Sequence, residues 1–210
     1  MIGTVFKWLS IAILLSSYKS LPGSYYVRFY YALMRIVLFS KTSNKGKDIL
    51  KVKSRLLTFC SLGECDFYLH KSNSTFLEEM DMARTELMLS LYKPLFAIDK
   101  LGSWPFLPVG SVDISFLKEI KPFQKYWVDS RVVSWDEKWL FVLSEFKVSS
   151  GKGERVCCTA ITKYVFKDPK TRATIPPAIA AEKSGLVFDE QEIEANYASV
   201  SRSKEQLNFS

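Results

Sequence analysis

The chain has 210 residues, 48% of them hydrophobic and 24% charged, which is enough for one domain with extensions and a sizeable core. Its net charge of +7 is unevenly spread, because residues 1–60 hold ten Lys or Arg and one acid, Asp48, for a net of +9. The same segment is crowded with aromatic and aliphatic residues, whereas an arm that binds nucleic acid is basic, polar and flexible. The composition therefore favours a membrane surface with anionic headgroups over nucleic acid, and no nucleic-acid partner is expected. The alternative is that these apolar stretches pack on the rest of the chain.

The first apolar segment, Met1–Ser17, contains the run Trp8–Leu15 with Lys7 before it. Read as far as Tyr18, it only just approaches the ~20 residues of a membrane-spanning helix. No small-x-small cleavage site precedes Lys19, which favours an uncleaved anchor over a removed signal peptide. More basic residues follow this segment than precede it. The positive-inside rule therefore favours a domain in the cytosol, and the membrane we expect is that of the endoplasmic reticulum.

The second apolar segment, Tyr25–Phe39, follows the breaker Leu21-Pro22-Gly23. Its charged residues Arg28 and Arg35 are seven positions apart and share one helical face with Tyr31. This layout predicts an aromatic-rich helix that lies in the membrane interface and extends its arginines to the headgroups. Residues 1–40 are therefore the predicted membrane-associated segment.

A polar linker, Ser40–Lys53, leads to a predicted strand, Leu56–Cys60, and then to a helix over about Asn73 to Tyr92. Strand patterns rich in Val, Phe, Trp and Thr follow in four runs, which are Val109–Leu117, Phe123–Trp135, Lys138–Val148 and Arg155–Phe166. The two-residue link Asp136-Glu137 predicts an antiparallel hairpin. The order of elements predicts an α+β fold with an antiparallel sheet in residues 41–180. Residues 181–210 read as a polar tail, in part helical near Glu190–Tyr197 or disordered.

The long helix begins at a start signal, Asn73-Ser74-Thr75. Its apolar residues recur at helical spacing and predict one buried face, made of Phe76, Leu77, Met80, Ala83, Leu87 and Leu91. The acids Glu78, Glu79 and Asp81 lie early in the helix, where they suit the helix dipole and solvent. Asp81 and Arg84 are spaced for an ion pair.

Just before this helix, Asp66 and the only histidine, His70, lie in a short polar loop. A carboxylate there lies beside unpaired backbone N–H groups and the positive end of the helix dipole, and both can polarise a carbonyl oxygen. Alternatively, Asp66 is a turn or capping residue and His70 is a structural histidine. No spacing fits a zinc site, a phosphate-binding loop or a nucleophile elbow, and the four cysteines read as buried, reduced thiols. No cofactor or metal is expected.

The stretch from Asp66 onward carries a family resemblance. It is similar to the pattern D-x-x-x-H-x-N-N-x-x-Y-L-x-x-x-D-x-A-R of hotdog-fold acyl-CoA thioesterases of the 4-hydroxybenzoyl-CoA thioesterase type. The matching residues are Asp66, His70, Asn73, Leu77, Asp81, Ala83 and Arg84. Phe76 stands in place of Tyr, and Ser72 in place of the first Asn. The motifs L-P-G-S (21–24) and W-D-x-K-W (135–139) resemble the membrane-anchored branch called thioesterase superfamily member six and its fungal relatives, over roughly residues 20 to 180.

The resemblance implies an antiparallel sheet wrapped round one long central helix, and a homodimer with its active sites at the subunit interface. It implies an acyl-CoA or related thioester substrate, with Asp66 as nucleophile or general base and backbone N–H groups near Asn73 as the oxyanion site. His70 would orient the loop or bond the substrate, and Asn73 would cap the helix. Some hotdog enzymes place the carboxylate on the helix, where Glu79 lies. Two hypotheses stay open: a membrane-associated thioesterase, and a non-catalytic hotdog module that binds lipid, acyl carrier or a protein partner at a membrane.

Overall fold

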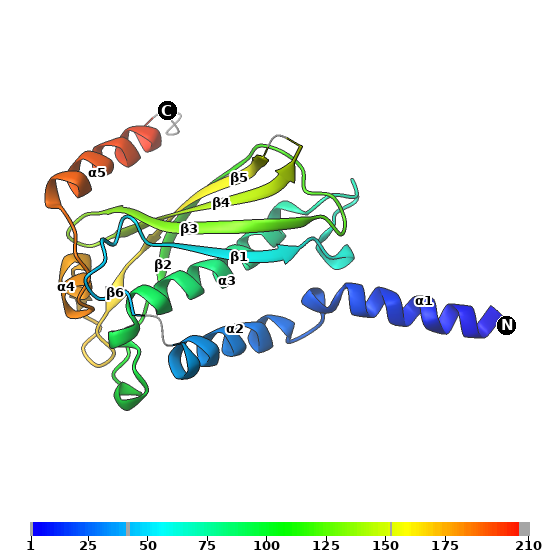
Figure 1. Cartoon of the computed structure of the whole chain (residues 1–210), viewed down its shortest axis with the longest axis horizontal. Helices are drawn as coiled ribbons and strands as arrows, with labels where there is room; N and C mark the ends of the chain where they lie inside the picture. Colours follow the sequence, from blue (N-terminus) through cyan, green and yellow to red (C-terminus); the bar gives the residue numbers. More distant parts are fainter. Residues whose placement is uncertain (1, 41–42, 152, 206–210) are drawn as a thin grey trace.

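The computed structural model describes residues 2–40, 43–151 and 153–205 (Figure 1). Its helices are α1 (Ile2–Ser16), α2 (Ser24–Met34), α3 (Asn73–Leu91), α4 (Pro177–Lys183) and α5 (Glu190–Glu205). Its strands are β1 (Lys53–Phe59), β2 (Val109–Phe116), β3 (Lys125–Trp135), β4 (Leu140–Ser150), β5 (Gly153–Tyr164), β6 (Phe166–Lys167) and β7 (Thr174–Ile175). Short helical turns are η1 (Tyr18–Ser20), η2 (Arg35–Phe39), η3 (Leu62–Glu64), η4 (Lys93–Leu95) and η5 (Ile98–Lys100).

The main sheet has five strands in the order β1-β3-β4-β5-β2, all antiparallel to their neighbours. This confirms the predicted α+β class with an antiparallel sheet. The hairpin between β3 and β4 is also confirmed, but its loop is Asp136–Trp139 and not the two predicted residues. The Asp136 carboxylate accepts N–H bonds from Lys138 (2.8 Å) and Trp139 (2.6 Å), which removes both residues from the strand.

Helix α3 lies against one face of the sheet and buries its apolar side there (Figure 1). Phe76, Met80 and Ala83 pack with inward-facing residues of β3 and β4 such as Tyr126 and Phe146. Leu77, which the periodicity placed on the buried face, is exposed instead. It lies one position beyond Phe76, on the side of the helix that the sheet does not cover.

Helix α5 covers part of the opposite face of the sheet, where Val200 packs with Val133 and Phe141. It is also held by a hydrogen bond from Ser134 Oγ to the carbonyl oxygen of Ile193, at 2.8 Å. The predicted tail is therefore helical over Glu190–Glu205 and packs on the rest of the chain through Ile193 and Val200, and residues 206–210 lie outside the described residues.

Helix α2 lies along α3 on the side away from the sheet (Figure 1). The arginines of α2 and η2 are turned toward α3, where Arg28 pairs with Glu79 at 2.7 Å and Arg35 pairs with Glu86 at 2.5 Å. The prediction that these arginines extend to lipid headgroups is therefore wrong, because carboxylates of the same chain take them. The described helices include none with both the length and the hydropathy to cross a bilayer.

Candidate active site

The segment between β1 and α3 contains a tight turn that we call the Asp66 loop (residues 65–72). The N–H of Asp66 donates to the carbonyl oxygen of His70 at 3.0 Å and closes the loop. The Asp66 Oδ1 atom accepts the N–H of Tyr68 at 2.9 Å, an Asx turn formed by the candidate catalytic residue itself. The backbone of Leu69 completes the turn in the left-handed region, with a φ of 57°.

Asp66 and His70, which the sequence places in one short loop, lie close together in the structure. His70 Nδ1 lies 3.4 Å from Asp66 Oδ2, and the two side chains are 31% and 30% exposed. The imidazole also stacks on the ring of Tyr68, with centroids 5.9 Å apart. One carboxylate oxygen therefore shapes the loop while the other faces the histidine, and a group of this exposure can be reached by water or a ligand.

The start of α3 differs from the prediction in one respect. Ser72 occupies the N-cap position, with φ −63° and ψ 140°, and its side chain makes no capping bond. Asn73 is the first helical residue and is exposed, so the predicted capping role of Asn73 is wrong. No side chain at the N-cap satisfies the N–H groups of Asn73 and Ser74, which are the donors that a helix start offers to an anionic oxygen.

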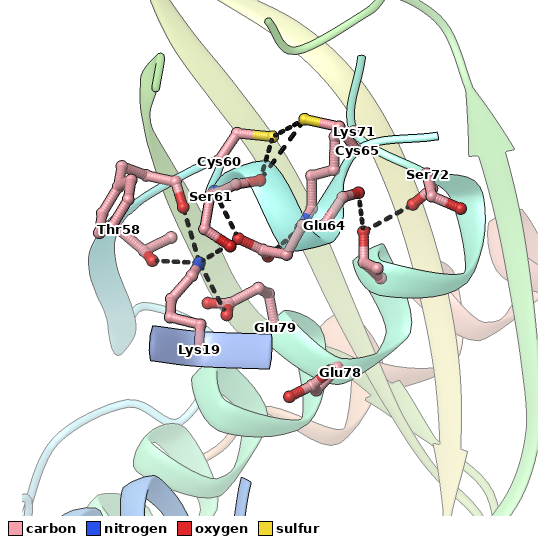
Figure 2. A network of polar contacts seen from close by, with 12 residues as sticks. Lys19, Thr58, Cys60, Ser61, Glu64, Cys65, Lys71, Ser72, Glu78 and Glu79 are labelled. Atoms are coloured by element: carbon pink, nitrogen blue, oxygen red, sulfur yellow. Dashed lines mark hydrogen bonds and ion pairs between the residues drawn. The ribbon is translucent and has the colours of Figure 1, made fainter. Parts of the chain in front are cut away.

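A buried glutamate, Glu64, fixes both ends of the Asp66 loop (Figure 2). Its carboxylate accepts the N–H of Ser61 at 2.8 Å and pairs with Lys71 Nζ at 2.6 Å. Its carbonyl oxygen accepts the N–H of Ser72, also at 2.8 Å. Because Ser61 precedes the loop and Lys71 and Ser72 end it, Glu64 sets where Asp66 lies relative to α3.

The second cation on Glu64 is Lys19, which comes from the N-terminal segment and is only 2% exposed. Its Nζ atom lies 2.9 Å from Glu64 Oε2 and 3.0 Å from Glu79 Oε1 (Figure 2). It also donates to the carbonyl oxygen of Phe59 at 2.6 Å and to Thr58 Oγ1 at 3.0 Å. The sequence pattern does not reveal the role of Lys19, because a lone lysine between two apolar segments is typical of a segment boundary.

Glu79 is buried, contrary to the prediction that the acids of this helix face solvent. Both of its oxygens are engaged, one by Lys19 and Arg28 and the other by Arg28 at 2.9 Å. This leaves no free oxygen for catalysis, so Glu79 is structural here. The predicted pair of Asp81 with Arg84 is confirmed.

These ion pairs make the stability of the fold depend on pH. Burial raises the pKa values of the Glu64 and Glu79 carboxyls, but the facing cations outweigh it, so both pKa values lie below the ordinary 4.5. A lowered carboxyl pKa gives stability that is present above the unfolded-state pKa and is lost as the pH falls through the folded-state value. Burial has the larger effect on Lys71, whose pKa is lowered although Glu64 favours its charge.

We therefore expect the thermal midpoint of the full chain to fall steeply as the pH drops below 4.5. Circular dichroism melts between neutral and acid pH measure this. The variant Asp168→Asn is the control and should keep the fall, since the pKa of Asp168 is also lowered, but by hydrogen bonds within its own turn and not by a buried ion pair. A midpoint that stays flat into strong acid would contradict the role given to the two buried glutamates.

The buried cysteine that precedes the loop, Cys60, is unsuited to act as a nucleophile. All four cysteines are free, and Cys60 Sγ lies 3.6 Å from Cys65 Sγ. Burial raises the pKa of Cys60 to about 12, which keeps its thiol protonated at neutral pH. Within the described residues, no group of three His, Cys, Asp or Glu side chains is arranged to hold a metal ion.

A cavity of about 400 Å³ opens between α2, α3 and the segment before β2. Its walls are mainly apolar and include Phe29, Leu33, Met88, Trp104 and Leu107. On α3 it begins at Asp81, eight residues after Asn73, which is ~12 Å along the helix axis. The cavity therefore lies on the helix whose first turn carries the exposed N–H groups.

Comparisons with known proteins agree on the family. Residues 60–182 match the family described as the thioesterase-like superfamily. A Saccharomyces cerevisiae protein named "Probable thioesterase" is 46% identical over 87% of this chain and 81% of its own length. A "Thioesterase" of Penicillium oxalicum is 31% identical over 88% of this chain and 72% of its own length.

Solved structures show the same fold at low sequence identity. The 4-hydroxybenzoyl-CoA thioesterase of Pseudomonas sp. strain CBS-3 is 16% identical, with a TM-score of 0.51 over 62% of this chain and 98% of its own. The YbaW probable thioesterase of Escherichia coli is 14% identical, with a TM-score of 0.51 over 67% and 98%. These likenesses show the hotdog fold that the motif around Asp66 led us to expect. The chain belongs to the thioesterase-like superfamily.

Proposed function

We propose that the protein hydrolyses acyl-CoA or a related thioester, with Asp66 as nucleophile or general base. The observation that carries this proposal is the accessible Asp66 carboxylate, paired with His70 and set just before a helix start without a side-chain cap. The relatives named as thioesterases support it. So does a solved 4-hydroxybenzoyl-CoA thioesterase in complex with 4-hydroxybenzoyl-CoA.

The arrangement suits either of two routes. As a base, Asp66 takes a proton from water while the water oxygen bonds to the thioester carbon. As a nucleophile, Asp66 bonds to that carbon and forms an anhydride, which water then opens. In both routes the carbon–sulfur bond breaks and the thiolate leaves and is protonated. The N–H groups of Asn73 and Ser74 stabilise the negative oxygen, His70 orients Asp66, and the acyl group extends toward the cavity along α3.

A thiol-release assay with the purified full chain and a series of acyl-CoA lengths tests this function. We expect release of free CoA and of the matching carboxylic acid in equal amounts. A chain that is folded but inactive on every thioester would instead support the non-catalytic hotdog module that binds lipid, acyl carrier or a protein partner at a membrane.

We also propose that residues 1–40 attach the protein to a membrane. The support is the exposed apolar surface of the two N-terminal helices. On α1 it includes Val5, Phe6 and Trp8, and on α2 it includes Val27 and Tyr30. Exposed basic residues of the N-terminal region, such as Lys7, Lys45 and Lys53, favour anionic lipids. We propose the endoplasmic reticulum as the membrane, with residues 41–180 and the C-terminal residues 181–210 in the cytosol, which protease protection of sealed microsomes tests.

Vesicle flotation measures the attachment. Deleting residues 1–40 is not a clean test, because it removes Lys19 and Arg28 from their buried carboxylates. A chain lacking residues 1–16 keeps both cations and loses the exposed apolar side of α1. We expect the full chain to float with vesicles and the shortened chain to float less, because apolar burial in the bilayer scales with area. Equal flotation would rule out α1 as an attachment site.

A homodimer through the β2 edge is the third part of the proposal. Strand β2 ends the sheet, and its Val109 and Phe116 side chains are exposed there. An unpaired edge with apolar side chains is a template for a second strand. We expect Phe116→Lys to shift the protein from dimer to monomer in sedimentation equilibrium. The substitution places one lysine from each subunit in the dimer interface, and the two like charges repel each other. Leu57→Lys on the β1 edge is the matched control and should stay dimeric; a monomeric wild type would refute the dimer.

A further inference from the structure

Two loops far apart in the sequence form one surface at the end of the sheet from which α1 projects (Figure 1). One is the Asp66 loop, and the other connects β2 to β3. The N–H of Lys71 donates to the carbonyl oxygen of Ile120 at 2.8 Å. A second backbone bond, from the N–H of Phe123 to the carbonyl oxygen of Cys60 at 2.7 Å, ties the β2–β3 connection to the segment that follows β1 and leads into the Asp66 loop. We call residues 67–69 and 117–125 the loop-end surface.

The loop-end surface exposes several large apolar side chains to solvent. Phe67, Tyr68 and Leu69 are 94%, 77% and 71% exposed, and they immediately follow the Asp66 carboxylate. Leu117 and Phe123 of the other loop are also exposed. Scattered exposed apolar residues are ordinary, but a cluster of five on two adjoining loops is typical of a surface that contacts a membrane or another molecule.

The backbone of this surface is also strained. Leu69 and Phe123 have φ values of 57° and 61°, in the left-handed region that bulky residues rarely adopt. In the part of the chain that the structure describes, Arg172 is the other non-glycine residue with positive φ. Strained backbone persists where the structure holds it for a purpose, and here it presents two apolar side chains to solvent.

The charge of the loop-end surface indicates the kind of partner that it binds. Residues 117–125 hold three exposed lysines, Lys118, Lys121 and Lys125, against one acid, Glu119. Exposed aromatic and aliphatic side chains interleaved with lysines are typical of a surface that binds a bilayer, because the apolar groups enter the lipid and the lysines contact anionic headgroups. A second copy of the same surface would bring lysines against lysines, because a two-fold contact pairs a patch with itself. The lysines thus favour a lipid surface over a second copy.

We infer that the loop-end surface docks on an anionic lipid bilayer and sets Asp66 at the boundary between lipid and water. The inference rests on the proposed membrane attachment and deepens it. Helix α1 holds the chain at the bilayer, and the loop-end surface determines which end of the sheet faces it. An acyl thioester whose chain is dissolved in the bilayer then meets Asp66 without leaving the interface.

Quenching of tryptophan fluorescence by brominated lipid measures how deeply the loop-end surface enters the bilayer, and the full chain is used. The probes are Phe67→Trp on the surface and Val187→Trp at another exposed apolar position, each compared with the wild type. The vesicles contain phosphatidylserine in brominated phosphatidylcholine. We expect the added fluorescence at position 67 to be largely quenched and that at position 187 to be unaffected. If the full chain binds the vesicles but position 67 stays unquenched, the docking surface is wrong while the membrane attachment stands.

Charge-matched variants test the lysines. Changing Lys118, Lys121 and Lys125 together to Gln should weaken binding to phosphatidylserine vesicles by about tenfold or more. The control changes three other exposed lysines, Lys51, Lys100 and Lys170, to Gln and should change binding little. Equal weakening by the two sets would overturn the inference. So would a spectrum at position 67 that shifts with protein concentration in the absence of lipid, since a second copy would then occupy the surface.

Discussion

Lys19→Met is expected to destabilise the protein by about 3–5 kcal/mol, the cost of removing one partner from a buried ion pair. The ammonium of Lys19 lies within 3.0 Å of carboxylate oxygens on Glu64 and Glu79. Methionine fills most of the same space but has no positive charge, so the two buried carboxylates lose one of the cations that face them. Lys71 still faces Glu64 and Arg28 still faces Glu79, so the loss falls short of two fully unpaired carboxylates. Chemical denaturation of the full chain, followed by circular dichroism, measures the change.

The control for this variant is Lys51→Met, which removes an ion pair with Asp48 at the surface and should leave the midpoint almost unchanged. A second comparison combines Lys19→Met with Glu79→Gln. Because the two residues are in contact, the double variant should lose less stability than the sum of the single variants. A Lys19→Met midpoint equal to that of Lys51→Met would refute the role of Lys19.

Local patterns were sufficient to predict the sheet. The predicted runs at Val109–Leu117 and Phe123–Trp135 differ from β2 and β3 by one or two residues at an end. Helix α3 begins at Asn73, where the start signal put it. These elements can be predicted from the sequence because the signals that mark them, which are periodicity and flanking turn residues, involve only residues close together in the chain. The β3–β4 loop was misjudged because the Asp136 carboxylate captures two N–H groups, a competition that alternation does not reveal.

The N-terminal segment shows where sequence reasoning stops. Arg28 and Arg35 share a helical face in any helix, but the pattern does not say whether that face meets lipid or protein. The answer depends on acids some fifty positions later, since Arg28 pairs with Glu79 and Arg35 with Glu86. Lys19 escaped notice for the same reason, because its contacts with Glu64 and Glu79 are long-range. Asp66 and His70 could be singled out from the sequence because they lie four residues apart in one short loop before a helix start.

Asp66→Asn is expected to lower kcat/KM by ~10²–10⁴-fold, the usual contribution of acid–base assistance. Asparagine keeps an oxygen that can accept the N–H of Tyr68, so the Asx turn and the fold should survive. It removes the negative charge needed to take a proton or attack the carbonyl. The thermal midpoint should therefore stay close to that of the wild type, which separates lost chemistry from lost structure.

The most direct measurement compares kcat/KM for CoA release by the wild type, by Asp66→Asn and by a control variant in one assay. The control is Asp99→Asn, which changes an exposed carboxylate in η5. Thermal midpoints are recorded for all three proteins. The structure predicts an active wild type, an unchanged Asp99→Asn and an Asp66→Asn that is folded but at least ~10²-fold slower. An Asp66→Asn protein with wild-type kcat/KM would contradict the assignment of thioester hydrolysis to Asp66.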